Sequence, residues 1–128
     1  MSDGTESGAN RQALRPRSGD LMLLDLAAEV ARLKQQPQWD ATDRHALSLV
    51  KDAGLNVMLL VLKRGAHMAE HHAKGPIALH VLEGCIRFSA NGQSVQATAG
   101  KLLALDRQVP HGVEAVEEST LLLITAIG

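Results

Sequence analysis

Short aliphatic segments separated by turn signals predict an all-β fold, a single antiparallel β-barrel of the jelly-roll kind with one short N-terminal helix. From about residue 46 onward, aliphatic and β-branched segments alternate with turns rich in Gly, Asp, Asn and Pro. Asn91-Gly92 lies between two such segments, and this pair favours a two-residue hairpin because both positions tolerate positive φ. No internal repeat is visible, so we expect one barrel.

The expected strands are short and evenly spaced. They are Leu47–Val50, Leu55–Leu62, Ile77–Leu82, Cys85–Ser89, Ser94–Thr98, Leu102–Leu105, Gly112–Val116 and Leu121–Ile127. The pattern divides the chain into a disordered tail over residues 1–19, a helix and linker over 20–45, and the barrel over 46–128.

The helix is predicted from three apolar residues at helical spacing, Leu26, Val30 and Leu33. Asp25 is placed to cap its N-terminus, and the helix is expected to end near residue 36 because a proline follows. Trp39 lies just beyond, and we expect its large ring to anchor this segment onto the barrel.

Composition excludes several classes of partner. The chain has 128 residues, 45% of them hydrophobic, with one Trp, one Phe and no Tyr, so the core is aliphatic and aromatic platforms for stacking bases are missing. Its net charge is −1, and its basic residues do not cluster beyond Arg11, Arg15 and Arg17. We therefore expect neither a nucleic-acid partner nor a membrane.

The location is expected to be cytoplasmic. Cys85 is the only cysteine, so the chain forms no internal disulfide and fits a reducing compartment. The N-terminus lacks the apolar segment of a signal peptide, and no apolar stretch reaches membrane-spanning length. Cys85 itself is expected to be a small buried residue on a strand.

The segment between Gly65 and Gly84 is unusually rich in histidine. It contains His67, His71, His72 and His80, and His111 follows later, after a proline. Histidine is the commonest metal-ligating side chain, and a pair of strands can bring distant histidines together. On one strand, however, residues 67 and 71 lie roughly 13 Å apart, which is too far for both to bind one ion.

This segment resembles the first motif of the cupins, a family of small jelly-roll barrels. That motif reads Gly, five residues, His, one, His, three or four, Glu, six, Gly. Gly65, His71 and Gly84 match it in identity and spacing. Ala73 stands at the position of the second His, and Ile77 at the position of the Glu.

A second cupin motif reads Gly, five residues, Pro, one, Gly, two, His, three, Asn. Gly100 and His111 match it, whereas Asp106, Gln108 and Ala115 replace the Pro, the Gly and the Asn. The resemblance covers about residues 46–127. It implies a cupin barrel with degenerate metal-binding motifs.

The resemblance also implies where a metal would bind, because cupins hold it with both His and the Glu of the first motif and the His of the second. Only His71 and His111 carry over by position, and His72 or His80 could supply a third ligand. We expect these four histidines to be the candidate metal ligands, for one divalent ion (Fe, Mn, Ni or Zn) or for none. His45 and His67 are expected to be surface residues or to have hydrogen-bond partners.

The favoured function is binding of a small molecule in the barrel, with or without a weak metal site of two or three histidines, and no reaction is assigned. The alternatives are a metal-dependent enzyme of the dioxygenase or isomerase type and a non-catalytic structural or sensor module. Strands that look hydrophobic on both faces suggest that the helix or a second subunit covers one sheet, and we expect a homodimer. The expected pocket walls are Leu59, Val61, Ile77, Leu79, Val81, Leu103 and Leu105.

Overall fold

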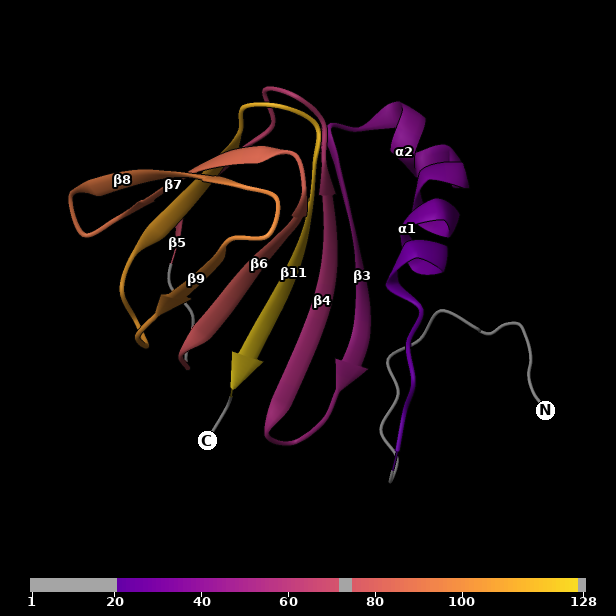
Figure 1. The fold of residues 1–128 in the computed structure, drawn as a ribbon, viewed down its shortest axis with the longest axis horizontal. Coiled ribbons are helices and arrows are strands. Elements are labelled where there is room, and N and C mark those ends of the chain that lie inside the picture. Colours follow the sequence, from indigo (N-terminus) through magenta and orange to yellow (C-terminus); the bar gives the residue numbers. More distant parts are fainter. Residues whose placement is uncertain (1–20, 72–74, 127–128) are drawn as a thin grey trace.

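The structure, a computed structural model, describes residues 21–71 and 75–126, without the side chains of residues 69–71. The expected tail over residues 1–19 and the candidate ligand His72 therefore lie outside the described residues. Two β-sheets face each other, and a helical segment lies beside one of them (Figure 1).

Both sheets are antiparallel. The five-stranded sheet has the order β3 (Arg44–Lys51), β4 (Leu55–Leu62), β11 (Ser119–Ala126), β6 (Ile77–Glu83) and β9 (Leu102–Leu105). The four-stranded sheet has the order β5 (His67–His71), β10 (His111–Ala115), β7 (Cys85–Ala90) and β8 (Gln93–Thr98). The all-β jelly-roll prediction is confirmed, and each expected strand is present with slightly shifted ends.

Local signals in the sequence account for several of these elements. The hairpin between β7 and β8 turns at Asn91 and Gly92, whose φ angles of 54° and 77° are both positive, as predicted. Helix α1 (Leu26–Gln35) begins after Asp25, whose side chain accepts a hydrogen bond from the Ala28 N–H at 3.1 Å.

A second short helix, α2 (Pro37–Ala41), was not expected from the sequence. Its first residue is proline, which that position tolerates because its backbone nitrogen has no partner within the helix. The turn of helix buries Trp39, which is 8% exposed, against the outer face of the five-stranded sheet. The Lys63 ammonium lies 4.8 Å from the centre of its ring. The predicted anchoring role of Trp39 is confirmed.

Two hydrophobic clusters lie on opposite faces of the five-stranded sheet. The interior cluster, between the sheets, is built from Leu60, Leu62, Ala66, Leu79, Val81, Ile86, Phe88, Ala97, Val113, Ala115 and Leu121. The outer cluster joins the helical segment to the sheet through Leu33, Trp39, Leu49, Leu59 and Val61. The expectation that Leu59 and Val61 line the pocket is therefore wrong. On β4 the even-numbered residues face the interior, because side chains alternate along a strand.

The chain makes its tightest turn at Gly84, between β6 and β7. Its φ is +93°, and a Cβ there would lie 2.3 Å from the Glu118 carbonyl oxygen and 2.4 Å from Ser119 Oγ. Ser119 is 1% exposed and accepts a hydrogen bond from the Cys85 N–H at 3.0 Å. Cys85 is buried, as predicted. The last glycine of the first motif is thus required for close packing of two strand ends.

Candidate functional site

The interior of the barrel is buried more deeply at one end than at the other. At the first end, which we call the closed end, Leu62, Val81, Ile86 and Leu121 are each 0% exposed. Farther along the same strands exposure rises: Leu79 is 3% and Ile77 is 7% exposed on β6. Interior residues at that second end are only partly buried; they include Met58, Ala90, Leu105 and Leu123. We call this second end the mouth.

The register of the five-stranded sheet defines one side of the mouth. Asn56 on β4 pairs with Thr125 on β11, which pairs with Ile77 on β6, which pairs with Leu105 on β9. Residues paired across antiparallel strands share a face, so this row faces the interior together with its neighbours in the interior cluster. A short turn then leads from the end of β9 to His111, the first residue of β10.

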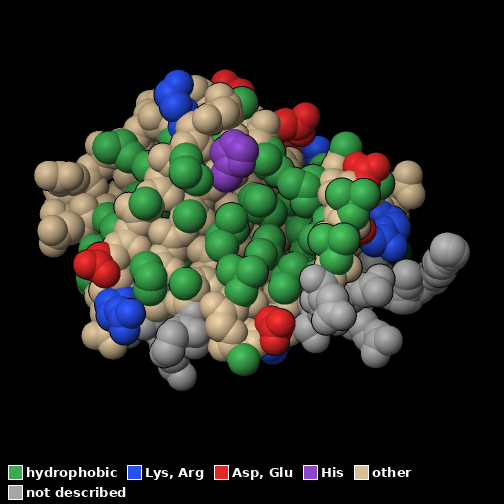
Figure 2. Space-filling view, turned by 60° about the horizontal axis from the view of Figure 1, so that its bottom comes forward, with side chains coloured by type: hydrophobic (Ala, Val, Ile, Leu, Met, Phe, Trp, Pro, Cys, Tyr) green, Lys and Arg blue, Asp and Glu red, His purple; other side chains and the backbone are tan. Residues whose placement is uncertain are grey.

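The mouth is mainly apolar. Among the residues that the structure describes, no Asp, Glu, Lys or Arg is buried, and the buried polar residues are His111, Ser119 and Thr120. Figure 2 brings the lower end of Figure 1 forward and shows hydrophobic side chains gathered over the middle of that face, with charged side chains around its edge. A ligand bound among the interior side chains would lie in an uncharged, mainly aliphatic environment.

His111 is the buried histidine of the mouth. It is 4% exposed, and its ring stacks on Phe88 with 5.6 Å between the ring centroids and 13° between the planes. Nδ1 lies 3.0 Å from the carbonyl oxygen of Val109, which can only accept, so Nδ1 donates. In the neutral ring the lone pair is then on Nε2. The Val109 carbonyl and the Phe88 ring therefore hold the imidazole in one tautomer and one orientation.

His71 pairs with His111 across β5 and β10 in the backbone register. Nearer the start of β5, Met68 pairs with Val113, so β5 carries one more residue than β10 between the two pairs. This β-bulge is the reason that residue 71, and not 70, lies opposite His111. The side chain of His71 lies outside the described residues.

The structure does not bring His80 together with His111. His80 lies between Leu79 and Val81, which belong to the interior cluster, and alternation places it on the opposite, outer face. Its partner on β11, Leu122, packs against the outer cluster. The sheet separates His80 from the mouth.

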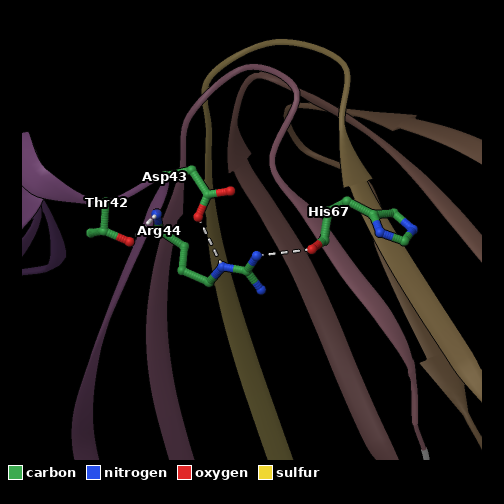
Figure 3. Close-up of polar contacts among 4 residues, drawn as sticks. All are labelled: Thr42, Asp43, Arg44 and His67. Atoms are coloured by element: carbon green, nitrogen blue, oxygen red, sulfur yellow. Dashed lines mark hydrogen bonds and ion pairs between the residues drawn. The ribbon is translucent and has the colours of Figure 1, made fainter.

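The remaining histidines have simple surroundings, as expected. His45 Nε2 lies 2.6 Å from Gln36 Oε1, next to the helices. His67 is exposed, and its carbonyl oxygen accepts a hydrogen bond of 2.9 Å from Arg44, which also binds Asp43 (Figure 3). That hydrogen bond from Arg44 lowers the pKa of the Asp43 carboxyl below its usual value. In Figure 3 the His67 ring points away from this contact.

A shallow hollow of about 160 Å³ lies on the outer face of the four-stranded sheet, over Gly112. Its charged lining residues, Arg87 and Glu114, form an ion pair of 2.9 Å, with about half of each side chain exposed. The two charges of this ion pair neutralise each other in solvent. Neither of them therefore needs a ligand to compensate it.

Sequence reasoning missed Asn56. Its Oδ1 is buried and has no hydrogen-bond partner. Buried polar atoms nearly always have one, so this is the orphaned acceptor of the mouth. A signal was present in the sequence, because Asn56 is the only polar residue in the run Leu55–Leu62. Its facing could not be assigned, since that run is apolar on both faces.

The side chains that the structure describes form no metal site by themselves. Among them, no three His, Cys, Asp or Glu lie close enough together to hold an ion. Ile77, at the position of the motif Glu, is 7% exposed and pairs with Leu105. The side chains of the candidate ligands His71 and His72 lie outside the described residues.

Comparison with solved structures shows which fold this is. A cupin superfamily protein from Desulfitobacterium hafniense superposes with a TM-score of 0.65 at 16% sequence identity, over 66% of this chain and 78% of its own. The protein has the cupin fold. No protein-family model and no curated protein matches the sequence, so the fold is recognised from structure.

Other structures with this fold differ in size and description. A conserved Streptococcus pyogenes protein of unknown function has a TM-score of 0.67 at 18% identity, over 93% of this chain and 98% of its own. Salicylate 1,2-dioxygenase from Pseudoaminobacter salicylatoxidans, in a structure with gentisate, has a TM-score of 0.72 at 16% identity, over 80% of this chain and 32% of its own. No helix in the described part of this chain is long and apolar enough to cross a membrane.

Proposed function

We propose that this cupin binds a small uncharged molecule at the mouth of its barrel, against His111, without a resident metal ion. The observation that carries the proposal is the environment of His111: a buried imidazole, held by Phe88 and by the Val109 carbonyl, at the less deeply buried end of a mainly apolar interior. Ligand sites in proteins are concave, mostly apolar, and contain a few oriented polar groups. No reaction is assigned.

We further propose that His71 contributes to the same site. The support is its backbone register opposite His111, set by the bulge in β5. The alternative is a metal-dependent enzyme of the dioxygenase type, in which His71 and His111 would be two of the ligands. The positions of the other two motif ligands argue against it, because they hold Ala73 and Ile77.

Metal analysis combined with an alcohol titration tests this function. We expect the purified protein to hold far less than one Fe, Mn, Ni or Zn per chain. Addition of 1-hexanol is expected to shift the imidazole NMR signals of His111, and His111→Ala should lose this binding. Hexanoate, a matched anion, should bind more weakly because the interior offers no cation among its described residues.

Two outcomes would contradict the proposal. Stoichiometric metal that disappears in both His71→Ala and His111→Ala would favour the enzyme. An unchanged 1-hexanol affinity in a folded His111→Ala variant would remove the site from the mouth.

We also propose that the protein is a homodimer in the cytoplasm. The dimer is supported by large apolar side chains left in solvent: Leu21 is 92%, Leu23 is 97% and Leu102 is 64% exposed. Leu21 and Leu23 precede α1, and Leu102 lies on the edge strand β9, so a second copy could cover them by a two-fold contact. The location is a prediction from the single cysteine.

Light scattering at micromolar concentration is expected to give the mass of a dimer. Exchanging Leu21 and Leu23 for serine should shift the mass toward the monomer, whereas exchanging the exposed Val95 on β8 should not. A monomeric mass for the unchanged protein would refute the dimer.

A further inference from the structure

Asn56 carries an unsatisfied hydrogen-bond acceptor inside the barrel. Its Oδ1 is buried without a partner, although the residues around it on β4 and β11 form a regular ladder. When the chain folds, a buried acceptor without a partner loses its hydrogen bond to water and forms no other, which destabilises the folded protein. An apolar residue at this position would therefore stabilise the ligand-free protein.

The position of Asn56 points to the mouth. It lies on the interior face of β4, in line with Met58 and Leu60, and its partner across the sheet is Thr125. The row of paired residues ends at Leu105, the last residue of β9. One short turn connects Leu105 to His111, the first residue of β10. Asn56 and His111 thus belong to opposite sheets at the same end of the barrel, with aliphatic side chains between them.

We propose that Asn56 is a second binding residue of the mouth and selects ligands with a hydrogen-bond donor. The inference rests on the proposed function and specifies its ligand class: an uncharged molecule with an aliphatic body, one end at the His111 ring and an O–H or N–H at the other end, donating to Asn56 Oδ1. An anion is disfavoured at Oδ1, because this atom only accepts hydrogen bonds and no described Lys or Arg is buried in the barrel.

The probes are straight alcohols with one or two hydroxyl groups. We compare 1-hexanol with 1,6-hexanediol, and we vary the diol from 1,4-butanediol to 1,8-octanediol to find the length that spans the mouth. The best diol is expected to bind about tenfold more tightly than the mono-alcohol of the same length, the ratio that one hydrogen bond typically gives. NMR titration measures both affinities.

Asn56→Leu should remove this advantage of the diol and leave 1-hexanol binding at His111 in place. The same variant should melt at a higher temperature than the unchanged protein, by about 4 °C or more, because the orphaned acceptor is gone. Met58→Leu, the next interior position on β4, changes the shape of the wall and not its polarity, so it should keep the preference for the diol.

The outcomes separate the two proposals. If 1-hexanol binds at His111 but the diol has no advantage, or keeps it in Asn56→Leu, the role of Asn56 is refuted and the proposed function stands. A lower melting temperature in Asn56→Leu would show that the amide is structural, and would refute it as well. If no alcohol binds at His111, the proposed function fails, and this inference fails with it.

Discussion

Replacing Gly84 by alanine is expected to lower the free energy of unfolding by about 2–5 kcal/mol. Two effects add at this turn. The backbone has a φ of +93°, and a Cβ would lie 2.3 Å from the Glu118 carbonyl oxygen and 2.7 Å from Ser119 Cα. Both of these are backbone atoms, so the strand end itself would have to move. Urea denaturation followed by circular dichroism measures the loss.

Gly100→Ala is the matched control, because Gly100 has nearly the same φ, +91°, and nothing within 4 Å of the added Cβ. It should cost about 1–2 kcal/mol, the effect of the left-handed backbone alone. Equal losses in the two variants would show that the close contact at Gly84 has no influence on stability.

Replacing Trp39 by alanine is expected to cost about 3–5 kcal/mol. The ring fills the space between the helical segment and the outer face of β3 and β4, where it packs with Leu33, Leu49 and Leu59. Without it, α1 and α2 lose their largest buried side chain. Chemical denaturation measures the cost, and hydrogen exchange should show faster exchange in α1 than in the four-stranded sheet.

The control for Trp39 is Lys63→Gln, which keeps the ring and removes the ammonium 4.8 Å from its centre. A cation that lies over an aromatic ring while still in contact with solvent contributes about 0.5–1 kcal/mol, so this variant should lose about that much. A small loss in Trp39→Ala, comparable to that of Lys63→Gln, would contradict the anchoring role of the indole.

The fold could be predicted because its signals are local. Asn91-Gly92 sets a hairpin, Asp25 caps a helix, and Gly84 matches a motif position between two strands. The facing of β4 could not be predicted. Nearly every residue from 55 to 62 is apolar, and the helices bury one face while the second sheet buries the other. A shift of one residue decides whether the even-numbered or the odd-numbered side chains of β4 face the interior, and the composition of the strand does not show which.

The candidate site, like the fold, could be predicted from the sequence only in part. His111 could be singled out from the sequence because it stands at a motif position, and the structure buries its side chain. Its role in a site stays a prediction. The pairing of His71 with His111 depends on a bulge in β5, which is a property of the register and not of the local sequence. Asn56 was missed because only the paired strands place it at the mouth. Residues from two sheets that lie at the same end of the barrel can be identified only once the strands are paired.

The graded burial of the barrel separates the parts of the chain that can change from those that cannot. At the closed end, side chains such as Val81 and Leu121 have no solvent exposure, and a substitution there disturbs the whole fold. At the mouth, Met58, Ala90 and Leu123 are partly buried, so their replacement disturbs fewer neighbours. Under the proposed function, ligand preference can therefore drift at the mouth while the closed end keeps the barrel intact. A set of variants at those three positions would then change specificity on an unchanged scaffold.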